Sequence, residues 1–221
     1  MVPVTDGVGD GDSEGALAGA PTGSGKSLAY LAPAVASGLK IVVATSTIAL
    51  QSQLVAKDLP ALQRNIDLPF TFALLKGRSN YLCRAKLRAA GAPDALFEQP
   101  VGLGFSVHLD RLRTFAKTSE TGDRSEVDDD ITNPTWAAVS CTSVECPGKA
   151  DCADGGDCFA ELARDRAREA SILVVNHALY CAHLASDGRV LPDHDVVIID
   201  EAHTFAAVSY THLTLPTNRE V

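Results

Sequence analysis

The sequence predicts an α/β fold, a parallel sheet with helices on both faces. Short runs of apolar, largely β-branched residues recur along the chain, with the clearest at residues 41–44, 172–175 and 196–199. Segments of helical pattern separate them. Strands that are apolar at every position are typical of parallel sheets, which are covered on both faces. The alternation breaks over residues 81–160, so this segment is expected to be an insert between strands.

The remaining elements are predicted from periodicity, capping residues and proline. Weaker strands are expected at residues 16–20 and 70–75. Helices are expected over residues 27–35, within 84–118 and over 161–170. A further helix is expected to begin after a cap at Thr47 and to end at about Leu59, before Pro60. Residues 1–15 and 119–160 are expected to be loops.

The composition is that of an ordinary soluble globular protein, with 46% hydrophobic and 21% charged residues. No run of about 18 apolar residues predicts a membrane span, and no secretory signal is visible. We therefore expect a cytoplasmic protein. The net charge of −9 argues against a simple DNA-coating protein. Six acids between residues 119 and 130 predict a solvated or disordered loop.

A phosphate-binding loop is predicted at residues 20–27, Ala-Pro-Thr-Gly-Ser-Gly-Lys-Ser. Its glycines let successive backbone N–H groups face the phosphates, and the next helix offers its positive end. Lys26 would reach the β- and γ-phosphates of ATP, and the Ser27 hydroxyl would bind Mg²⁺. The expected nucleotide-binding residues are Thr22, Gly23, Ser24, Gly25, Lys26 and Ser27. Alone, the motif also fits a turn that binds nothing.

The other half of the nucleotide site is predicted where the run 196–199 ends in Asp-Glu-Ala-His. Asp200 can hold Mg²⁺ opposite Ser27, directly or through water. Glu201 is placed to polarise the water that attacks the γ-phosphate. Alone, two acids after a strand also fit a solvated turn. The expected catalytic residues are Lys26, Asp200 and Glu201, with Asp200 and His203 also at the nucleotide.

Several motifs together resemble one helicase family. The Asp-Glu-Ala-His box resembles that of helicases with two RecA-like motor domains. Residues 44–51 resemble their motif Ia, which touches the nucleic-acid backbone. Residues 76–83, Lys-Gly-Arg-Ser-Asn-Tyr-Leu-Cys, and 176–179, Asn-His-Ala-Leu, are similar to segments of the DinG/XPD group. The resemblance covers residues 20–206, and the bacterial DinG-like branch fits best.

The resemblance implies a RecA-like motor domain that carries an inserted iron–sulphur domain. It implies an ATP-dependent helicase that moves 5′ to 3′ on single-stranded DNA, as a monomer, in DNA repair or replication. The expected division is residues 1–80 and 161–206 for the motor domain and 81–160 for the insert. Residues 207–221 look like translated adapter sequence and are expected to be a non-native tail.

Six cysteines are present, and four of them lie between residues 141 and 158. In a cytosolic protein such spacing is more typical of metal binding than of disulfides. Four thiolates can hold a [4Fe–4S] cluster or a tetrahedral Zn²⁺. The resemblance favours the cluster, with Cys83, Cys146, Cys152 and Cys158 as ligands. Cys141 could replace Cys146, and Cys181 is expected to be a core residue in a strand-to-loop region.

A path for single-stranded DNA is implied by motif Ia and by a basic segment. Thr45 and Thr47 would hydrogen-bond phosphate oxygens. Tyr81 would stack on a base, or would be a core aromatic. The basic residues expected to contact phosphates, unless they form a solvated helix face, are Lys76, Arg78, Arg84, Lys86 and Arg88.

Three other functions are compatible with these motifs. One is a cluster-bearing DNA-binding module that does not translocate, and another is a zinc-stabilised ATPase. The third is a DinG-like nuclease with a degenerate motor, against which the intact Lys26, Asp200 and Glu201 argue.

Overall fold

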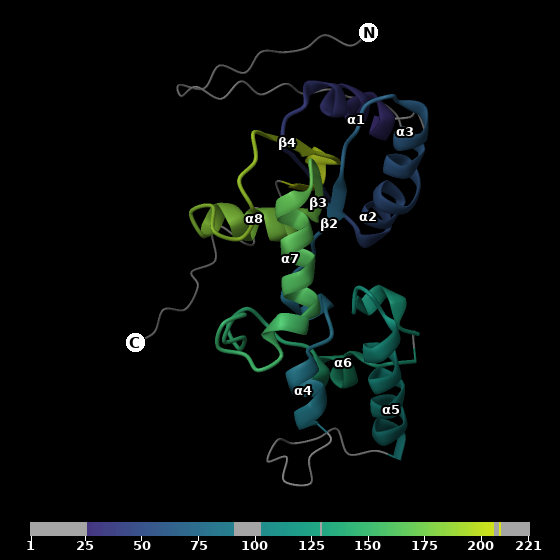
Figure 1. Ribbon diagram of the computed structural model, residues 1–221, viewed down its shortest axis with the longest axis vertical. Coiled ribbons are helices and arrows are strands. Elements are labelled where there is room, and N and C mark those ends of the chain that lie inside the picture. The colour runs from purple at the N-terminus through teal and green to yellow at the C-terminus, as the bar shows by residue number, and fades with distance from the viewer. Residues whose placement is uncertain (1–25, 91–102, 129, 206–207, 209–221) are drawn as a thin grey trace.

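The structure is a computed structural model that describes residues 26–90, 103–128, 130–205 and 208. Its centre is a four-stranded parallel sheet in the order β2-β3-β1-β4 (Figure 1). The predicted α/β class and the three clearest strands are confirmed. The strand expected at residues 16–20 lies outside the described residues. The strands are β1 (Ile41–Thr45), β2 (Phe72–Leu74), β3 (Ile172–Asn176) and β4 (Val196–Ile199).

Alternate side chains of the sheet enter two hydrophobic cores. Ile41 and Val43 face a core formed with α1 (Lys26–Ser37) and α3 (Leu59–Asn65). Val42 and Ala44 face the opposite core, to which α7 (Phe159–Glu169) and α8 (His177–Ala185) contribute. Burial on both faces explains why β1 and β3 are apolar at nearly every position. Figure 1 shows α1 and α3 on one side of the sheet and α8 on the other.

The helical segment after β1 is longer than predicted. It comprises α2 (Ile48–Gln53), a π-helical turn (Leu54–Asp58) and α3. The expected end at Leu59 is wrong because Pro60 lies in the first turn of α3.

The insert lies below the sheet in Figure 1, and α7 leads from it back to β3. Its helices within the described residues are α4 (Arg84–Ala89), α5 (Leu103–Thr118) and α6 (Asn133–Val139), with short 3₁₀ turns at Arg124–Glu126 and Gly155–Asp157. A further 3₁₀ turn, Arg78–Asn80, precedes the insert. The prediction of loops throughout 119–160 is therefore wrong at α6. The Thr132 side chain caps this helix by accepting a hydrogen bond from the Thr135 N–H, and a proline occupies the first turn.

The insert and one face of the sheet share a continuous core. Buried Leu82, Leu112 and Trp136 of the insert belong to the same cluster as Leu173 and Val175 of β3. The Trp136 Nε1 group also donates a hydrogen bond to the Ser79 carbonyl at 2.7 Å. The insert is thus fixed to the sheet by packing as well as by the chain.

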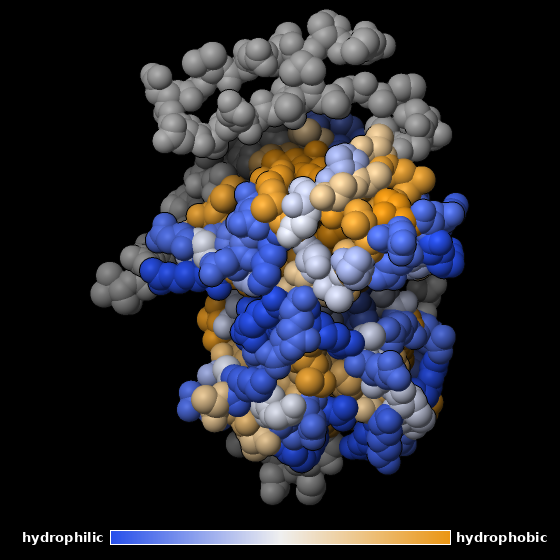
Figure 2. Space-filling view, turned by 45° about the horizontal axis from the view of Figure 1, so that its top comes forward, coloured by the Kyte–Doolittle hydropathy of each residue, from blue (hydrophilic) through white to orange (hydrophobic). Residues whose placement is uncertain are grey.

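Figure 2 shows hydrophobic residues gathered on the upper part of the described surface and largely hydrophilic residues on the lower part. The partly exposed apolar residues include Leu28 on α1, Ile48 on α2 and Val196 on β4. None of the described helices is both long and apolar enough to cross a bilayer.

Candidate functional site

The first turn of α1 is connected to the end of β4. The Tyr30 hydroxyl donates a hydrogen bond to Asp200 Oδ2 at 3.2 Å, across 170 residues of sequence. Burial, and then the Asp200 charge, raises the pKa of Tyr30. Ser27 lies three residues before Tyr30 on the same helix, so the two expected Mg²⁺ ligands both lie near this tyrosine. Lys26 begins α1, whereas Thr22, Gly23, Ser24 and Gly25 lie outside the described residues.

The Asp200–Glu201 corner is held by its backbone. The Asp200 N–H donates to the Ala44 carbonyl at 2.8 Å, which continues the pairing between β4 and β1. The Glu201 N–H donates to Asp200 Oδ1 at 3.0 Å. Glu201 has φ = 56°, in the left-handed region that non-glycine residues rarely adopt. His203 Nδ1 lies 3.4 Å from Glu201 Oε2, and its side chain is 73% exposed.

A buried histidine from another strand end contacts this corner. His177 is 1% exposed and follows β3 directly. Its Nε2 lies 2.9 Å from the Asp200 carbonyl oxygen, and its Nδ1 lies 3.3 Å from Thr204 Oγ1. Burial lowers the pKa of His177, against the opposing effect of the Asp200 carbonyl. The sequence singled out residues 176–179 only as a resemblance, so this contact was not predicted.

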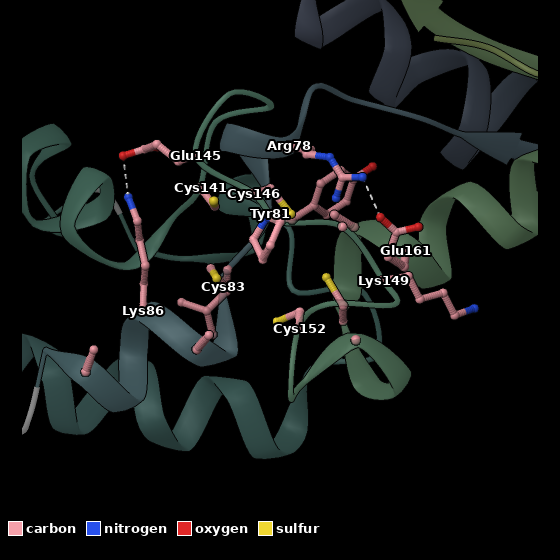
Figure 3. A pocket seen from close by; sticks show the side chains of 18 residues that line it. Arg78, Tyr81, Cys83, Lys86, Cys141, Glu145, Cys146, Lys149, Cys152 and Glu161 are labelled. Carbon is pink, nitrogen blue, oxygen red and sulfur yellow. Dashed lines mark hydrogen bonds and ion pairs between the residues drawn. The ribbon is translucent and has the colours of Figure 1, made fainter. Parts of the chain in front are cut away.

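The cysteine-rich segments meet at one cavity of about 290 Å³ (Figure 3). Cys83 reaches it from the start of α4, and Cys158 from the start of α7. Cys181 lies apart from this cavity, fully buried in α8. Its prediction as a core residue is confirmed, but its expected position between a strand and a loop is wrong. The cysteines that line the cavity are Cys83, Cys141, Cys146, Cys152 and Cys158.

The thiols supply a donor set that fits an iron–sulphur cluster. All are free cysteines, and they approach the cavity from segments far apart in the sequence. Burial, and then the Cys83 and Cys146 thiolates, raises the pKa of Cys141 to about 11. Bound metal would offset this mutual repulsion, because the ligands of a metal are thiolates. Among the described residues, no three His, Cys, Asp or Glu side chains converge on a single ion position.

Each of the five basic residues expected to contact DNA has a partner within the protein. Four form ion pairs, and Arg84 lies 4.2 Å from the centre of the Phe159 ring and donates to the Asp157 carbonyl. Apart from the Lys76 pair, these contacts join α4 and the preceding turn to the cysteine-containing loops and α7. The ion pairs are Lys76–Asp123, Arg78–Glu161, Lys86–Glu145 and Arg88–Asp154.

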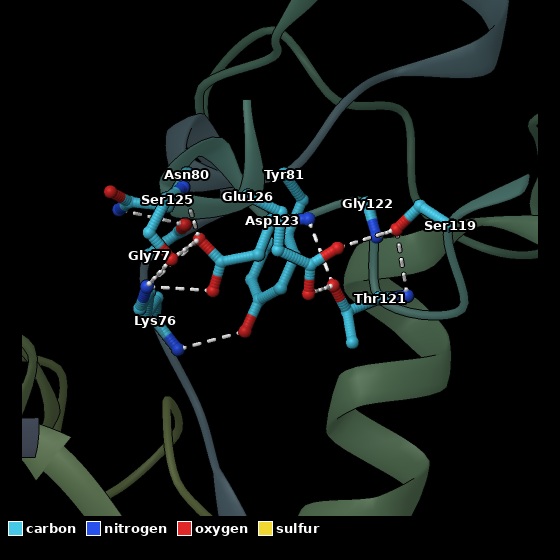
Figure 4. Close-up of polar contacts among 10 residues, drawn as sticks. All are labelled: Lys76, Gly77, Asn80, Tyr81, Ser119, Thr121, Gly122, Asp123, Ser125 and Glu126. Carbon is cyan, nitrogen blue, oxygen red and sulfur yellow. Dashed lines mark hydrogen bonds and ion pairs between the residues drawn. The ribbon is translucent and has the colours of Figure 1, made fainter. Parts of the chain in front are cut away.

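Lys76 and Tyr81 belong to a buried polar network (Figure 4). The Tyr81 ring is 4% exposed, and its hydroxyl accepts a hydrogen bond from the Lys76 N–H at 3.0 Å. The alternative of a core aromatic is therefore confirmed for Tyr81. Asp123 is also buried and accepts hydrogen bonds from the N–H and hydroxyl of Ser125. The expectation of a solvated acidic loop is therefore wrong at Asp123.

The two threonines of the motif Ia segment differ in exposure. Thr45 is fully buried, and its hydroxyl donates to the Thr47 carbonyl at 3.2 Å. Thr47 is exposed, and its side chain caps α2 by accepting from the Leu50 N–H at 3.2 Å. The predicted cap is confirmed, while contact of either residue with phosphate stays a prediction.

The chain is similar in sequence to known proteins. Residues 9–117 match the DEAD/DEAH box helicase family. The ATP-dependent helicase DinG of Mycobacterium tuberculosis (strain ATCC 25177 / H37Ra) is 41% identical over 204 residues, which cover 85% of this chain. The ATP-dependent DNA helicase YoaA of Escherichia coli (strain K12) is 38% identical over 191 residues, covering 83%. The ATP-dependent DNA helicase DinG of Photobacterium profundum is 33% identical over 206 residues, covering 86%.

The chain spans only part of these relatives. It covers 31% of the mycobacterial protein and 29% of each of the other two.

Proposed function

Because the chain belongs to the DinG-like DEAD/DEAH box helicases, we propose that it binds ATP·Mg²⁺ beside the Asp200–Glu201 corner and that hydrolysis drives movement along single-stranded DNA. The observation that carries this proposal is the hydrogen bond from Tyr30, three residues after Ser27 in α1, to Asp200. It brings the helix after the predicted phosphate loop against the acidic end of β4. A metal ion shared by a hydroxyl and a carboxylate needs these two segments side by side.

Each residue at the Asp200–Glu201 corner has a different role in ATP hydrolysis. Ser27 and Asp200 hold Mg²⁺, and Lys26 neutralises charge on the β- and γ-phosphates. Glu201 orients the attacking water and accepts its proton. His203, exposed beside Glu201, would contact the nucleotide. The loop residues Thr22, Gly23, Ser24 and Gly25 would bind the phosphates through their backbone N–H groups.

We further propose that residues 81–160 form an iron–sulphur domain, with the motor domain on either side. Cys83, Cys146, Cys152 and Cys158 would hold a [4Fe–4S] cluster, with Cys141 at the same cavity as the alternative to Cys146. When bound, such a cluster supplies covalent cross-links between segments distant in sequence, which stabilise a loop-rich domain.

The DNA contacts are proposed residue by residue. Thr47 is exposed and can reach a phosphate without rearrangement. Thr45 and Tyr81 are buried, so either would have to be uncovered before it could bind DNA. Arg78 and Arg84 would first have to leave Glu161 and Phe159. The proposed direction of movement is 5′ to 3′, by a monomer in the cytoplasm acting in DNA repair or replication.

The test uses the complete protein, purified without oxygen. ATP hydrolysis should rise when single-stranded DNA is added, and a duplex with a 5′ tail should be unwound while one with a 3′ tail is not. Lys26→Ala should abolish both activities, whereas the control Lys40→Ala, at the exposed residue before β1, should keep them. DNA binding without ATP-driven unwinding would contradict the proposal and favour a binding module.

A further inference from the structure

We infer that His177 is a positioning residue for ATP hydrolysis, which holds the backbone of Asp200 and Glu201 so that the Glu201 carboxylate stays directed at the nucleotide. The inference rests on the proposed function, since it concerns the same acidic corner. It adds a residue that has no assigned contact with ATP or Mg²⁺ and acts through the backbone of Asp200 and Glu201.

The order of the strands places His177 beside this corner. β3 and β4 are both neighbours of β1, so their carboxyl ends lie one strand apart at the same edge of the sheet. The chain turns into α8 directly after β3, where the Asn176 side chain caps the helix by accepting from the Leu179 N–H at 2.8 Å. His177 is the first residue of this helix and extends across the end of β1 to β4.

The imidazole ring contacts the corner through both nitrogen atoms. Nε2 lies 2.9 Å from the Asp200 carbonyl oxygen. Nδ1 lies 3.3 Å from Thr204 Oγ1, which itself lies 2.9 Å from the Glu201 carbonyl oxygen. The ring is therefore connected to two consecutive carbonyl groups, one directly and one through a hydroxyl. Phe205 packs edge-on against the ring, with 5.2 Å between ring centres, and fixes its plane.

The backbone at Glu201 needs such support. Its φ of 56° is unfavourable for a residue with a side chain, and a conformation of this kind persists only when its surroundings hold it. The direction of the Glu201 side chain depends on this backbone angle. If the contacts to the carbonyls are lost, the peptide can relax and turn the carboxylate away from the water that it orients.

The competing explanation is that His177 only fills space in the core. The same helix provides a matched control in His183, which is 9% exposed and accepts a hydrogen bond from the Leu191 N–H at 3.0 Å. His183 also stacks on Tyr180, 6.0 Å away between ring centres, so these partners belong to α8 and to the segment before β4. Phenylalanine at either position keeps a buried ring and removes its hydrogen bonds.

The experiment compares His177→Phe with His183→Phe in the complete protein, measuring kcat, KM for ATP and the thermal unfolding midpoint. His177→Phe should lower kcat by about 10-fold to 10²-fold, as expected for a displaced catalytic group, and leave KM near its original value. His183→Phe should lower the unfolding midpoint by a similar amount without lowering kcat. Equal kcat for both variants would overturn the inference.

Two further variants keep the test decisive. His177→Gln retains an amide N–H for the Asp200 carbonyl and should recover part of kcat. Thr204→Val removes the hydroxyl that links the ring to Glu201 without touching the core of α8. It should lower kcat even if His177→Phe fails to fold, and unchanged kcat for Thr204→Val would then reject the inference.

A double variant separates this inference from the proposed function. Combined with Glu201→Gln, His177→Phe should lower kcat no further, because the positioned group is already gone. If Glu201→Gln alone leaves hydrolysis intact, the proposed function fails. If Glu201→Gln abolishes hydrolysis while His177→Phe and Thr204→Val do not reduce it, only the positioning role fails.

Discussion

Lys76 and Asp123 form a buried two-point ion pair, with Lys76 Nζ 2.8 Å from Asp123 Oδ1 and 2.6 Å from Oδ2. The two side chains are 4% and 10% exposed. Lys76 lies just after β2, and Asp123 lies 47 residues later, in the insert. This pair ties the insert to the edge of the sheet at one point.

Asp123→Asn should destabilise the chain strongly, because it leaves the Lys76 charge buried without a counter-charge. Breaking a buried pair from one side typically costs about 3–5 kcal/mol. Urea unfolding followed by the fluorescence of Trp136, the single tryptophan of the chain, measures the free energy of unfolding. The control Asp154→Asn breaks the Arg88 pair, in which Arg88 is 65% exposed, and should cost about 1 kcal/mol or less. An equal loss in the free energy of unfolding for the two variants would contradict the claim that burial makes the Lys76–Asp123 pair important.

Tyr81 should make stability fall at alkaline pH. Burial raises the pKa of Tyr81 from 10.0 to about 12, although the Lys76 N–H partly opposes this rise. The neutral phenol is therefore favoured in the folded chain. Its contribution is complete below pH 10 and is lost as the pH rises towards 12, while the unfolded chain ionises first. The free energy of unfolding of Tyr81→Phe should fall less steeply over this window, and parallel curves for the two proteins would refute the assignment.

The cysteine cavity should hold iron and sulphide when the protein is made without oxygen. About four of each per chain and a broad brown absorbance are expected for a [4Fe–4S] cluster. Cys146→Ser should lose the iron, while Cys141→Ser should keep it. Cys181→Ser, which changes a buried thiol away from the cavity, is the matched control and should also keep it. Zinc without sulphide would reject the cluster, and loss of iron in Cys141→Ser alone would exchange the roles of Cys141 and Cys146.

The strands of the sheet could be predicted because each is recognisable from a short run of neighbouring residues. β1 and β3 are short runs in which nearly every residue is apolar, and burial on both faces requires this pattern. β4 has the same apolar sequence, although its residues are partly exposed in the structure. α6 was not predicted because the sequence indicates it only by one capping residue and one proline. The helix is too short to show a repeated helical spacing of apolar residues. The π-helical turn before α3 leaves no mark in hydrophobic periodicity.

The residues of the candidate sites could be predicted from the sequence, but the contacts between them could not. The residue types and spacing of Ser27, Asp200 and Glu201 indicate a nucleotide site, and those of the cysteines indicate metal binding. Pairing is a property of the folded chain, so the basic segment could not reveal that Lys76 would meet Asp123 rather than a phosphate. The contact of His177 with the Asp200 carbonyl depends likewise on the order of the strands.

The measurement that tests the account most directly is ATP binding and DNA-stimulated hydrolysis by Glu201→Gln in the complete protein. Glutamine keeps the size and hydrogen bonding of the side chain but cannot accept the proton of the attacking water, so turnover should fall by about 10²–10⁴-fold. ATP and single-stranded DNA should still bind, because Lys26, Ser27 and Asp200 remain. Asp200→Asn should weaken Mg²⁺-dependent ATP binding as well. Near-normal hydrolysis by Glu201→Gln would contradict the central claim that this corner carries the chemistry.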